Sequence, residues 1–418
     1  MALTLTTADS ALKEFYLPAV REQLNMTNWL LMQVEKNSTD IEGRRAVLSL
    51  HVGRNPSVGA RVEGAALPGT NSAGSTSIGV QDYAEERVPL KYEYGRIQLS
   101  GPVIRAMKSD RGSFVRAIES ETKGVTNDLK KDVNRQLWGD TSGQIDNFAA
   151  QGPLNTLTLG AATTRVQQRQ IEVGMVIDIG SAANSTSVAE FRTVTAVSFA
   201  TLPGTITISG APVTTATTDF LYRSGLNPGG SASGVELTGV QSIVSASGTL
   251  FNVNPTNDAS WASYVDSNGG TLRSISENLL ASVMHNVEIR SGYTAGSSNL
   301  WATSDGVFRA YANLLTAQKR FSNTLEIKGG FKGLDITAGG GSVPMVWERD
   351  APSNTAWYLD TSHLMEFEMS DWDYMDNDGA VLSRRSNIDA YEATLYKYME
   401  FTTDQRNANG RLSDITEA

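Results

Sequence analysis

The stretch VPLKYEYGRIQLSGPVI, residues 88–104, carries the pattern on which the fold depends. From Val88 to Ser100 it is rich in aromatic and β-branched residues, which predicts one long strand. Its apolar positions change parity along the way, from Val88, Leu90, Tyr92 and Tyr94 to Ile97 and Leu99. Because one face of a strand holds every second residue, a bulge or bend near Gly95 and Arg96 is expected to turn both groups inward.

A second strand is predicted upstream, in AVLSLHV at residues 46–52. Between the two strands lies a polar segment punctuated by glycines: Gly53, Gly59, Gly64, Gly69, Gly74 and Gly79. This segment has too few large apolar side chains to form a core of its own. We predict a long two-stranded hairpin that leaves the body, and because an isolated hairpin is marginal in water, we expect it to rest on a partner surface.

Downstream, the strongest helical pattern in the chain begins at Ser113, a capping residue, and stops at Gly139. An apolar stripe marks its buried face: Phe114, Ile118, Val125, Leu129, Val133 and Leu137. A helix from Ser113 to Leu137 would be about 37 Å long at 1.5 Å per residue, long enough to act as a structural spine.

Two further units follow the helix. Residues 157–225 are rich in Thr, Ser, Val and Gly, and predict a small antiparallel barrel from short runs at 171–179, 191–197, 205–208 and 220–222. After Gly225 the pattern indicates helices flanking a sheet. Helices are expected at 275–287 and 307–315, and strands at 299–303, 344–347, 356–359 and 389–401.

The first forty residues, Met1 to Asp40, read as an arm. Apolar residues recur there at helical spacing, with Pro18 expected to kink or split the helix: Leu12, Phe15, Tyr16, Val20 and Leu24. Two interpretations stay open, a helix lying on its own domain and an arm packing on a neighbouring subunit.

The composition excludes several classes of protein. The 418-residue chain has no cysteine, which removes disulfide scaffolds, thiolate nucleophiles, zinc fingers and iron–sulfur sites. Its net charge of -10 disfavours general electrostatic coating of nucleic acid. The histidines His51, His285 and His363 are isolated, and no phosphate-binding loop, dinucleotide fingerprint or serine-nucleophile motif is evident. We therefore expect no enzyme activity, cofactor or metal, and, without an export signal or membrane-length apolar run, a cytosolic protein.

Taken in order, these features resemble the major capsid proteins of tailed bacteriophages, with the Hong Kong 97-type shell fold. Residues 88–104 look like the returning strand of the extended loop, and NRQLWGDTSG (134–143) looks like the end of the spine helix. LTGVQSIVS (237–245), SWASYV (260–265) and NLLASVM (278–284) resemble the axial domain. Two stretches near the end of the chain resemble the closing segment of that family: DWDYMDNDGAVLSRRSNIDAYEATLYKYMEF (371–401) and RNANGRL (406–412).

The resemblance implies an α+β fold with six parts. These are an N-terminal arm (1–45), an extended β-hairpin loop (46–100), the spine helix and peripheral domain (101–154), an inserted antiparallel β-barrel (155–225), an axial domain (226–345), and a return through the axial and peripheral domains to the C-terminal segment (346–418). It also implies self-assembly into pentamers and hexamers, which form an icosahedral shell around double-stranded phage DNA.

The resemblance further implies partners and a location. The partners are copies of the chain itself, a portal protein, a separate scaffolding protein, a decoration protein in some systems, and packaged DNA bound without sequence specificity, with no membrane. The location is the virion capsid, assembled in the cytoplasm of the host bacterium. Two alternatives stay open: the shell of a cellular protein nanocompartment with the same fold, and a secreted β-rich carbohydrate-binding or carbohydrate-degrading protein, against which the missing export signal argues.

Charged residues of the extended loop are the expected intersubunit contacts: Arg54, Arg61, Glu63, Glu85, Glu86, Arg87 and Lys91. One family member uses a loop lysine for a covalent cross-link, but no pattern here secures one at Lys91. Basic residues also cluster on and before the long helix: Arg105, Lys108, Arg111, Arg116, Lys123, Lys130, Lys131 and Arg135. They predict either a solvated helix face with i,i+4 ion pairs or a face close to the packaged genome.

Overall fold

The computed structural model describes residues 29–38, 41–53, 55, 57–66, 68–69, 79–102, 111–161, 164–181, 187–225, 234–292, 299–317, 324–327, 331–338, 341–376 and 381–418. The predicted arm helix at residues 12–24 lies outside these ranges, as do Arg54, Arg105 and Lys108.

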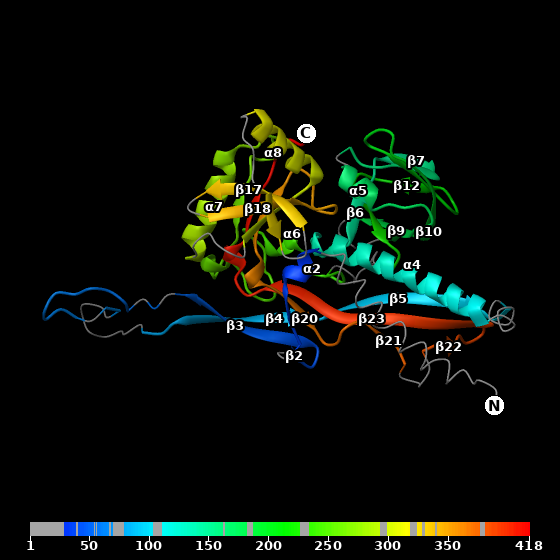
Figure 1. Cartoon of the computed structure of the whole chain (residues 1–418), viewed down its shortest axis with the longest axis horizontal. Helices are drawn as coiled ribbons and strands as arrows, with labels where there is room; N and C mark the ends of the chain where they lie inside the picture. The colour runs from blue at the N-terminus through cyan, green and yellow to red at the C-terminus, as the bar shows by residue number, and fades with distance from the viewer. Residues whose placement is uncertain are drawn as a thin grey trace.

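A long, flat layer of strands forms one side of the molecule (Figure 1). In it, β3 (Arg45–Gly53) and β4 (Asp82–Pro89) are antiparallel strands that pair from Arg45 opposite Pro89 to His51 opposite Tyr83. The upstream strand of the hairpin is thus confirmed, but the return strand is β4, which shares only Val88 and Pro89 with the strand predicted at 88–100. The outer part of the hairpin extends beyond the body at one end of the layer (Figure 1). The short β2 (Ile41–Glu42) pairs with the start of β3.

The predicted long strand is divided at Leu90 into β4 and β5 (Lys91–Ser100), which belong to different sheets. β5 pairs with β23 (Ala390–Thr403) in one unbroken register. The expected bulge near Gly95 is therefore wrong. The parity changes where the chain passes from one sheet to the next, so Tyr92 and Tyr94 are exposed while Glu93, Gly95, Ile97 and Leu99 are covered.

β23 is the central strand of the six-stranded sheet to which β5 belongs, which we call the base sheet. Its edge opposite β5 pairs with β20 (Leu364–Glu368), β21 (Asp373–Tyr374) and β22 (Ser383–Arg384), and β1 (Glu35–Asn37) lies parallel to β20. The short helix α2 (Trp29–Gln33) precedes β1 and buries Trp29 and Leu30 in the main hydrophobic core.

The long helix α4 (Arg111–Leu137) lies on the base sheet, close to its predicted bounds. Leu129, Val133 and Leu137 are buried in the same core as Ile97 of β5 and Leu395 of β23. Gly95 permits this close approach, because a Cβ atom there would lie 2.7 Å from side-chain atoms of Val125 and Leu129. The glycine thus serves helix packing rather than a bend.

The inserted unit contains a six-stranded antiparallel sheet. Its strands, in spatial order, are β6 (Gln144–Asn147), β13 (Asp219–Arg223), β9 (Val176–Ser181), β10 (Ser187–Ser198), β11 (Thr205–Ile208) and β8 (Thr156–Thr158). A bridge between Phe148 and Leu159 connects the two ends of this order. β7 (Gln151–Leu154) pairs with β12 (Val213–Thr215), and α5 (Arg165–Arg169) lies between β8 and β9.

The observed bounds of this unit and of its strand β9 differ from the sequence predictions. Its sheet includes β6, which precedes the expected boundary at residue 155. The sequence did not predict this strand, because the short polar run QIDN has little strand propensity. Residues 171–175 were expected to open a strand, but β9 begins at Val176. The chain turns at Gly174, whose φ of 91° lies in the left-handed region that favours glycine.

A seven-stranded sheet forms the third unit. Its strands, in spatial order, are β14 (Tyr264–Asp266), β24 (Gly410–Leu412), β19 (Ala356–Asp360), β15 (Asn299–Thr303), β18 (Gly341–Trp347), β17 (Phe331–Ala338) and β16 (Thr324–Ile327). The helices of this part are α6 (Val240–Ile243), α7 (Glu277–Ser291) and α8 (Asp305–Ala317). β15 has the predicted bounds and is buried throughout.

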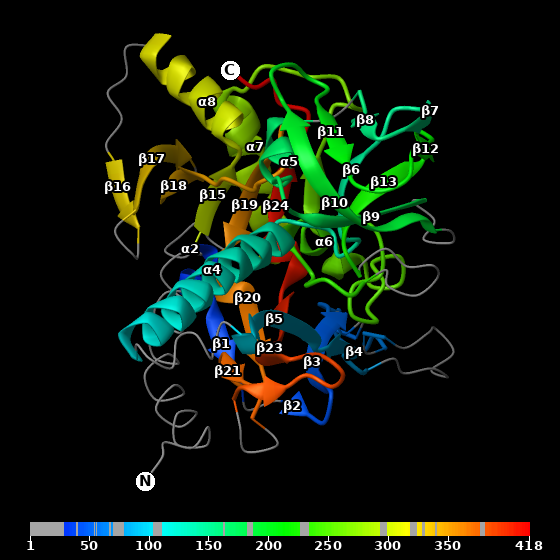
Figure 2. The same cartoon turned by 90° about the vertical axis from the view of Figure 1, so that its right-hand side faces the viewer.

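Figure 2 shows how α4 joins the three units. The helix crosses above the base sheet, with the inserted unit and the seven-stranded sheet on its other side. The closing segment of the chain contributes β23 to the base sheet and β24 to the seven-stranded sheet. The three units are therefore linked by segments from both halves of the sequence.

Candidate functional site

The alternation of β4 places the charged residues of the hairpin on two faces. Glu85 and Arg87 are exposed and form a two-point ion pair, in which Arg87 Nε and Nη2 each lie 3.0 Å from a carboxylate oxygen of Glu85. The hydrogen bond from Arg87 lowers the pKa of the Glu85 carboxyl. This pair lies on a face that is open to a neighbouring molecule.

Glu86 lies on the opposite face and is fully buried. The Thr402 hydroxyl of β23 donates to its Oε1 at 2.7 Å, and burial raises its pKa to about 8. A carboxyl enclosed by its own subunit cannot form an intersubunit ion pair, so the prediction of an intersubunit contact at Glu86 is wrong. The sequence could have predicted this burial, because Glu86 lies on the same face of the strand as the apolar Val88 and Leu90.

The other predicted hairpin contacts are dispersed. Arg61 and Glu63 are exposed in the outer hairpin, where Arg61 Nη1 donates to the carbonyl oxygen of Ala60 at 2.9 Å. Lys91 is half-buried at the start of β5. Among the described members of the set, the structure brings together Glu85 and Arg87 alone.

The outer hairpin also exposes apolar side chains that the sequence reasoning did not single out. The exposed fractions are 65% for Val58, 79% for Val62, 74% for Val80 and 67% for Tyr83. Apolar groups gathered on one projecting element are typical of an interaction surface.

The basic residues of α4 do not form one face. Lys123 and Lys131 are exposed, and Lys131 Nζ lies 3.1 Å from Glu172 Oε1 in the inserted unit. Lys130 and Arg135 are buried, with 8% and 6% of each exposed, so neither can face a packaged genome. The side chains of Arg111 and Arg116 lie outside the described part of the structure.

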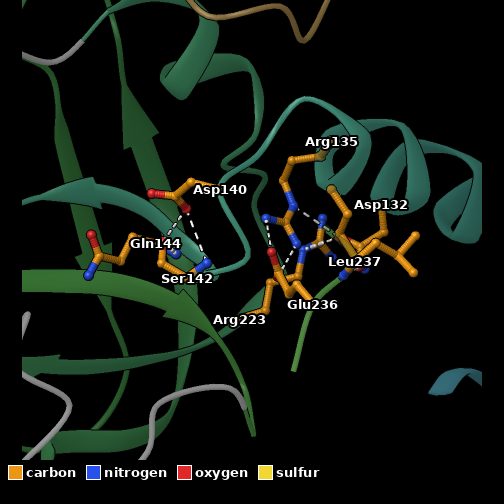
Figure 3. Close-up of polar contacts among 9 residues, drawn as sticks. Asp132, Arg135, Asp140, Ser142, Gln144, Arg223, Glu236 and Leu237 are labelled. Atoms are coloured by element: carbon orange, nitrogen blue, oxygen red, sulfur yellow. Dashed lines mark hydrogen bonds and ion pairs between the residues drawn. The ribbon is translucent and has the colours of Figure 1, made fainter. Parts of the chain in front are cut away.

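Arg135 is instead the centre of a buried ion cluster (Figure 3). Its Nη1 donates to Glu236 Oε2 at 3.0 Å and its Nε donates to Asp132 Oδ1 at 3.1 Å. Asp132 also lies 2.8 Å from Nε of Arg223 in β13. Burial disfavours the charged forms of Arg135 and Asp132. The carboxylates of Asp132 and Glu236 nevertheless raise the pKa of Arg135, and Arg135 and Arg223 lower the pKa of Asp132. The cluster ties α4 to the inserted unit and to the segment that leads into α6.

Glu93 of β5 lies next to this cluster and is also buried. Burial, followed by the nearby charge of Asp132, raises its pKa to about 8. Gln136 extends the network, because its Oε1 accepts from the backbone N–H of Leu237 at 2.9 Å and its Nε2 donates to Asp132 at 3.1 Å. The C-terminal end of α4 is thus held by polar contacts as well as by packing.

A second buried ion cluster fixes the start of the described chain to the base sheet. Lys397 Nζ of β23 lies 2.5 Å from Glu366 and 2.6 Å from Glu368, both in β20. Lys36 of β1 approaches the same two carboxylates at 3.7 and 3.3 Å. No local pattern predicts this cluster, because Lys397 lies 31 positions from Glu366 and Lys36 lies 332 positions from Glu368.

The cavity beside α4 is lined by charged side chains that are paired with one another. A cavity of about 500 Å³ lies between α4, α5 and β13. Its cations are already paired with carboxylates: Lys131 with Glu172, Arg135 and Arg223 with Asp132, Arg169 with Asp305, and Arg349 with Asp350. Within the described ranges, no cluster of three or more metal-ligating side chains occurs, and none of the helices is long and apolar enough to cross a membrane.

Comparison with solved structures identifies the fold. A chain of the cyanophage A-1(L) capsid asymmetric unit superposes with a TM-score of 0.54 at 14% sequence identity, over 95% of this chain and 93% of that one. The SrpI encapsulin complex of Synechococcus elongatus aligns over 93% of this chain and 88% of its own, with 9% identity and a TM-score of 0.45, which does not establish a shared fold. No family model matches the chain, and no curated protein is significantly similar to it in sequence. The chain has a phage-capsid fold along nearly its whole length.

Proposed function

We propose that the chain is the major shell subunit of a tailed-phage capsid, which self-assembles into pentamers and hexamers around double-stranded DNA. The observation that carries this proposal is the outer hairpin, which leaves the body and exposes Val62 and Val80 by 79% and 74%. Burial of apolar surface against a neighbour releases about 25 cal/mol per Å². The fold shared with the cyanophage capsid chain supports the same conclusion.

Assembly follows from repetition of weak contacts. Each subunit offers its hairpin to one neighbour and receives the hairpin of another, and closure of the ring makes every added contact intramolecular. The exposed Glu85–Arg87 pair lies on the same face of β4 as the exposed Tyr83, so it can exchange partners with charges on a neighbour. Such rim charges steer association more than they strengthen it.

The other partners follow from the same proposal. A portal protein and a separate scaffolding protein set where and how the shell closes, and a decoration protein is compatible with the exposed surface. DNA would be held without sequence specificity by exposed cations, of which Lys123 and Lys131 are the described examples on α4.

The experiment that tests the proposal replaces residues 54–79 by a short turn and compares the variant with the intact chain. We expect a soluble subunit with a cooperative unfolding transition that forms no closed shells in electron micrographs. Phe191→Ala is the matched control, because it removes a side chain that is 70% exposed on the inserted unit. Normal shells from the shortened chain would contradict the proposal, and shells that contain protein cargo without nucleic acid would favour a nanocompartment.

A further inference from the structure

An open groove of about 680 Å³ lies where the inserted unit meets the seven-stranded sheet. The helices beside it, α5 and α8, lie on the side of the molecule away from the base sheet (Figure 1). Both units contribute to its lining: Arg169 of α5, Asp305, Phe308 and Arg309 of α8, and Trp347 and Arg349 at and just after the end of β18.

Two polar contacts cross this junction and shape the groove. Arg169 Nη2 lies 3.0 Å from Asp305 Oδ2, and Arg349 Nη2 donates to the carbonyl oxygen of Arg169 at 3.4 Å. The side chains of Arg169 and Asp305 keep 34% and 32% of their surface exposed. The groove is therefore part of the contact between two units and remains open to a partner.

Trp347 is exposed in this groove, although tryptophan is otherwise an interior residue of this chain. All seven tryptophans lie within the described ranges. Trp347 is 52% exposed, whereas each of the other six is 5% exposed or less. Phe308 lines the same groove and is half-buried. Exposed aromatic surface in a hollow is typical of an interaction site, because a partner that covers it removes apolar area from water.

The groove is basic in a chain whose net charge is -10. Three arginines line it with a single carboxylate, Asp305, which lies 3.0 Å from Arg169 Nη2 and 3.8 Å from Arg309 Nη2. The Arg349 side chain is 45% exposed, and its Nε lies 3.9 Å from Oδ1 of Asp350, which is buried beneath the groove. The lining therefore offers guanidinium groups to added carboxylates, which arginine binds well in a two-point geometry.

We propose that this groove binds an acidic peptide segment of a partner protein, with an apolar side chain against Trp347 and Phe308 and carboxylates on Arg309 and Arg349. Arginine and tryptophan are the residue types that most often dominate binding energy at protein interfaces. The charges of groove and segment would be complementary. Nucleic acid fits less well, because its binding depends on many cations along a backbone, and this groove is short and contains Asp305.

A segment bound there would contact both units and hold the inserted unit against the seven-stranded sheet. Binding to the folded subunit alone raises its stability by mass action. In an assembly of many copies the groove recurs once in each subunit, so a partner with several such segments would bind by multivalency. The inference goes beyond the proposed shell function and can fail without affecting it.

The test selects random peptides from a ribosome-display library on the intact chain. We expect the enriched peptides to combine several acidic residues with an apolar one. A synthetic copy of the strongest binder should protect Trp347 from acrylamide quenching, which reports on this site because the other six tryptophans are buried. A second copy, with each Asp and Glu replaced by Asn and Gln, should bind much more weakly.

Variants of the chain assign the binding to the groove. Arg349→Gln and Trp347→Ala should each weaken binding of the acidic peptide at least about tenfold. Arg309→Gln, a change at a side chain that is 60% exposed, gives a second charge variant that leaves the core untouched. Arg96→Gln is the matched control, because it removes an arginine that is 57% exposed on the base sheet, and it should bind like the unmodified chain.

Three outcomes would overturn the inference. The first is a selection that enriches no peptide, or enriches neutral or basic ones. The second is an acidic peptide that binds the Arg349→Gln and Arg309→Gln variants as tightly as the unmodified chain. The third is an oligonucleotide that displaces the peptide, binds more tightly and requires the same arginines, which would assign the groove to nucleic acid. Shell formation by the same variants, scored in electron micrographs, tests the shell function separately.

Discussion

Arg135 and Glu236 stand 101 positions apart in the sequence and form a buried ion pair, with Nη1 3.0 Å from Oε2. Arg135 belongs to the helix that lies on the base sheet, and Glu236 opens the segment that leads into the seven-stranded sheet. The pair joins α4 to that segment, together with the hydrogen bond from the Leu237 N–H to Gln136, and Asn134 of the same helix donates to Glu348 and Asp350.

Arg135→Met is expected to destabilise the subunit by about 3–5 kcal/mol, because it leaves Asp132 and Glu236 buried without their cation. The measurement is urea-induced unfolding of the unassembled subunit. The control is Lys131→Met, which breaks an exposed pair with Glu172 and should cost under about 1 kcal/mol. Equal losses from the two variants would show that the buried cluster contributes no more than a surface pair.

Glu86 and Glu93 predict a pH-dependent stability. Burial raises the pKa of each carboxyl from its ordinary value of 4.5 to about 8, so between these pH values the folded subunit binds protons that the unfolded chain releases. This contribution is fully present below pH 4.5 and is lost as the pH rises toward 8 and beyond. We therefore expect Glu86→Gln and Glu93→Gln to stabilise the subunit relative to the unmodified chain at pH 8.5, with a smaller gain at pH 5.

The check is the free energy of unfolding of all three proteins across that pH range. Glu85→Gln serves as the control, because Glu85 is exposed and its pKa is lowered rather than raised. A gain from Glu93→Gln that does not change with pH would mean that its carboxyl is ionised in the folded subunit.

Gly95→Ala is expected to destabilise the subunit by about 1–3 kcal/mol, because overpacking forces neighbouring atoms apart. The added methyl group would meet Val125 and Leu129 at 2.7 Å. Gly124→Ala, inside α4 and with nothing within 4 Å of its Cβ position, should instead stabilise by about 0.5–1 kcal/mol. Thermal unfolding distinguishes the two, and the same sign for both would contradict the packing described for Gly95.

Much of the fold could be predicted from sequence because local signals were strong. The apolar stripe placed α4 to within two residues, although the helix begins at Arg111 and Ser113, the expected cap, lies inside it. A buried run gave β15 its bounds. Tyr92 and Tyr94 were placed inward because alternation alone cannot show that a strand changes sheets at Leu90. That change depends on β23, nearly three hundred residues away along the chain.

The charged residues were harder to place than the elements that carry them. Glu86, Lys130 and Arg135 were chosen by charge, yet each is buried. Arg135 has one local partner, Asp132, but its second partner, Glu236, lies 101 positions away. Thr402, the partner of Glu86, lies 316 positions away, and no local spacing predicts it. The glycine-rich polar segment predicted that the hairpin leaves the body, but it did not show that Val58, Val62 and Val80 are exposed there.

The central claim, that copies of this chain build a closed shell, is tested most directly by electron microscopy with size-exclusion chromatography of the purified chain. The chain is expressed alone and then together with its genomic neighbours. We expect closed icosahedral particles, or capsomer rings that close when a scaffolding partner is added. A monomer under every condition, with the hairpin intact, would contradict the account.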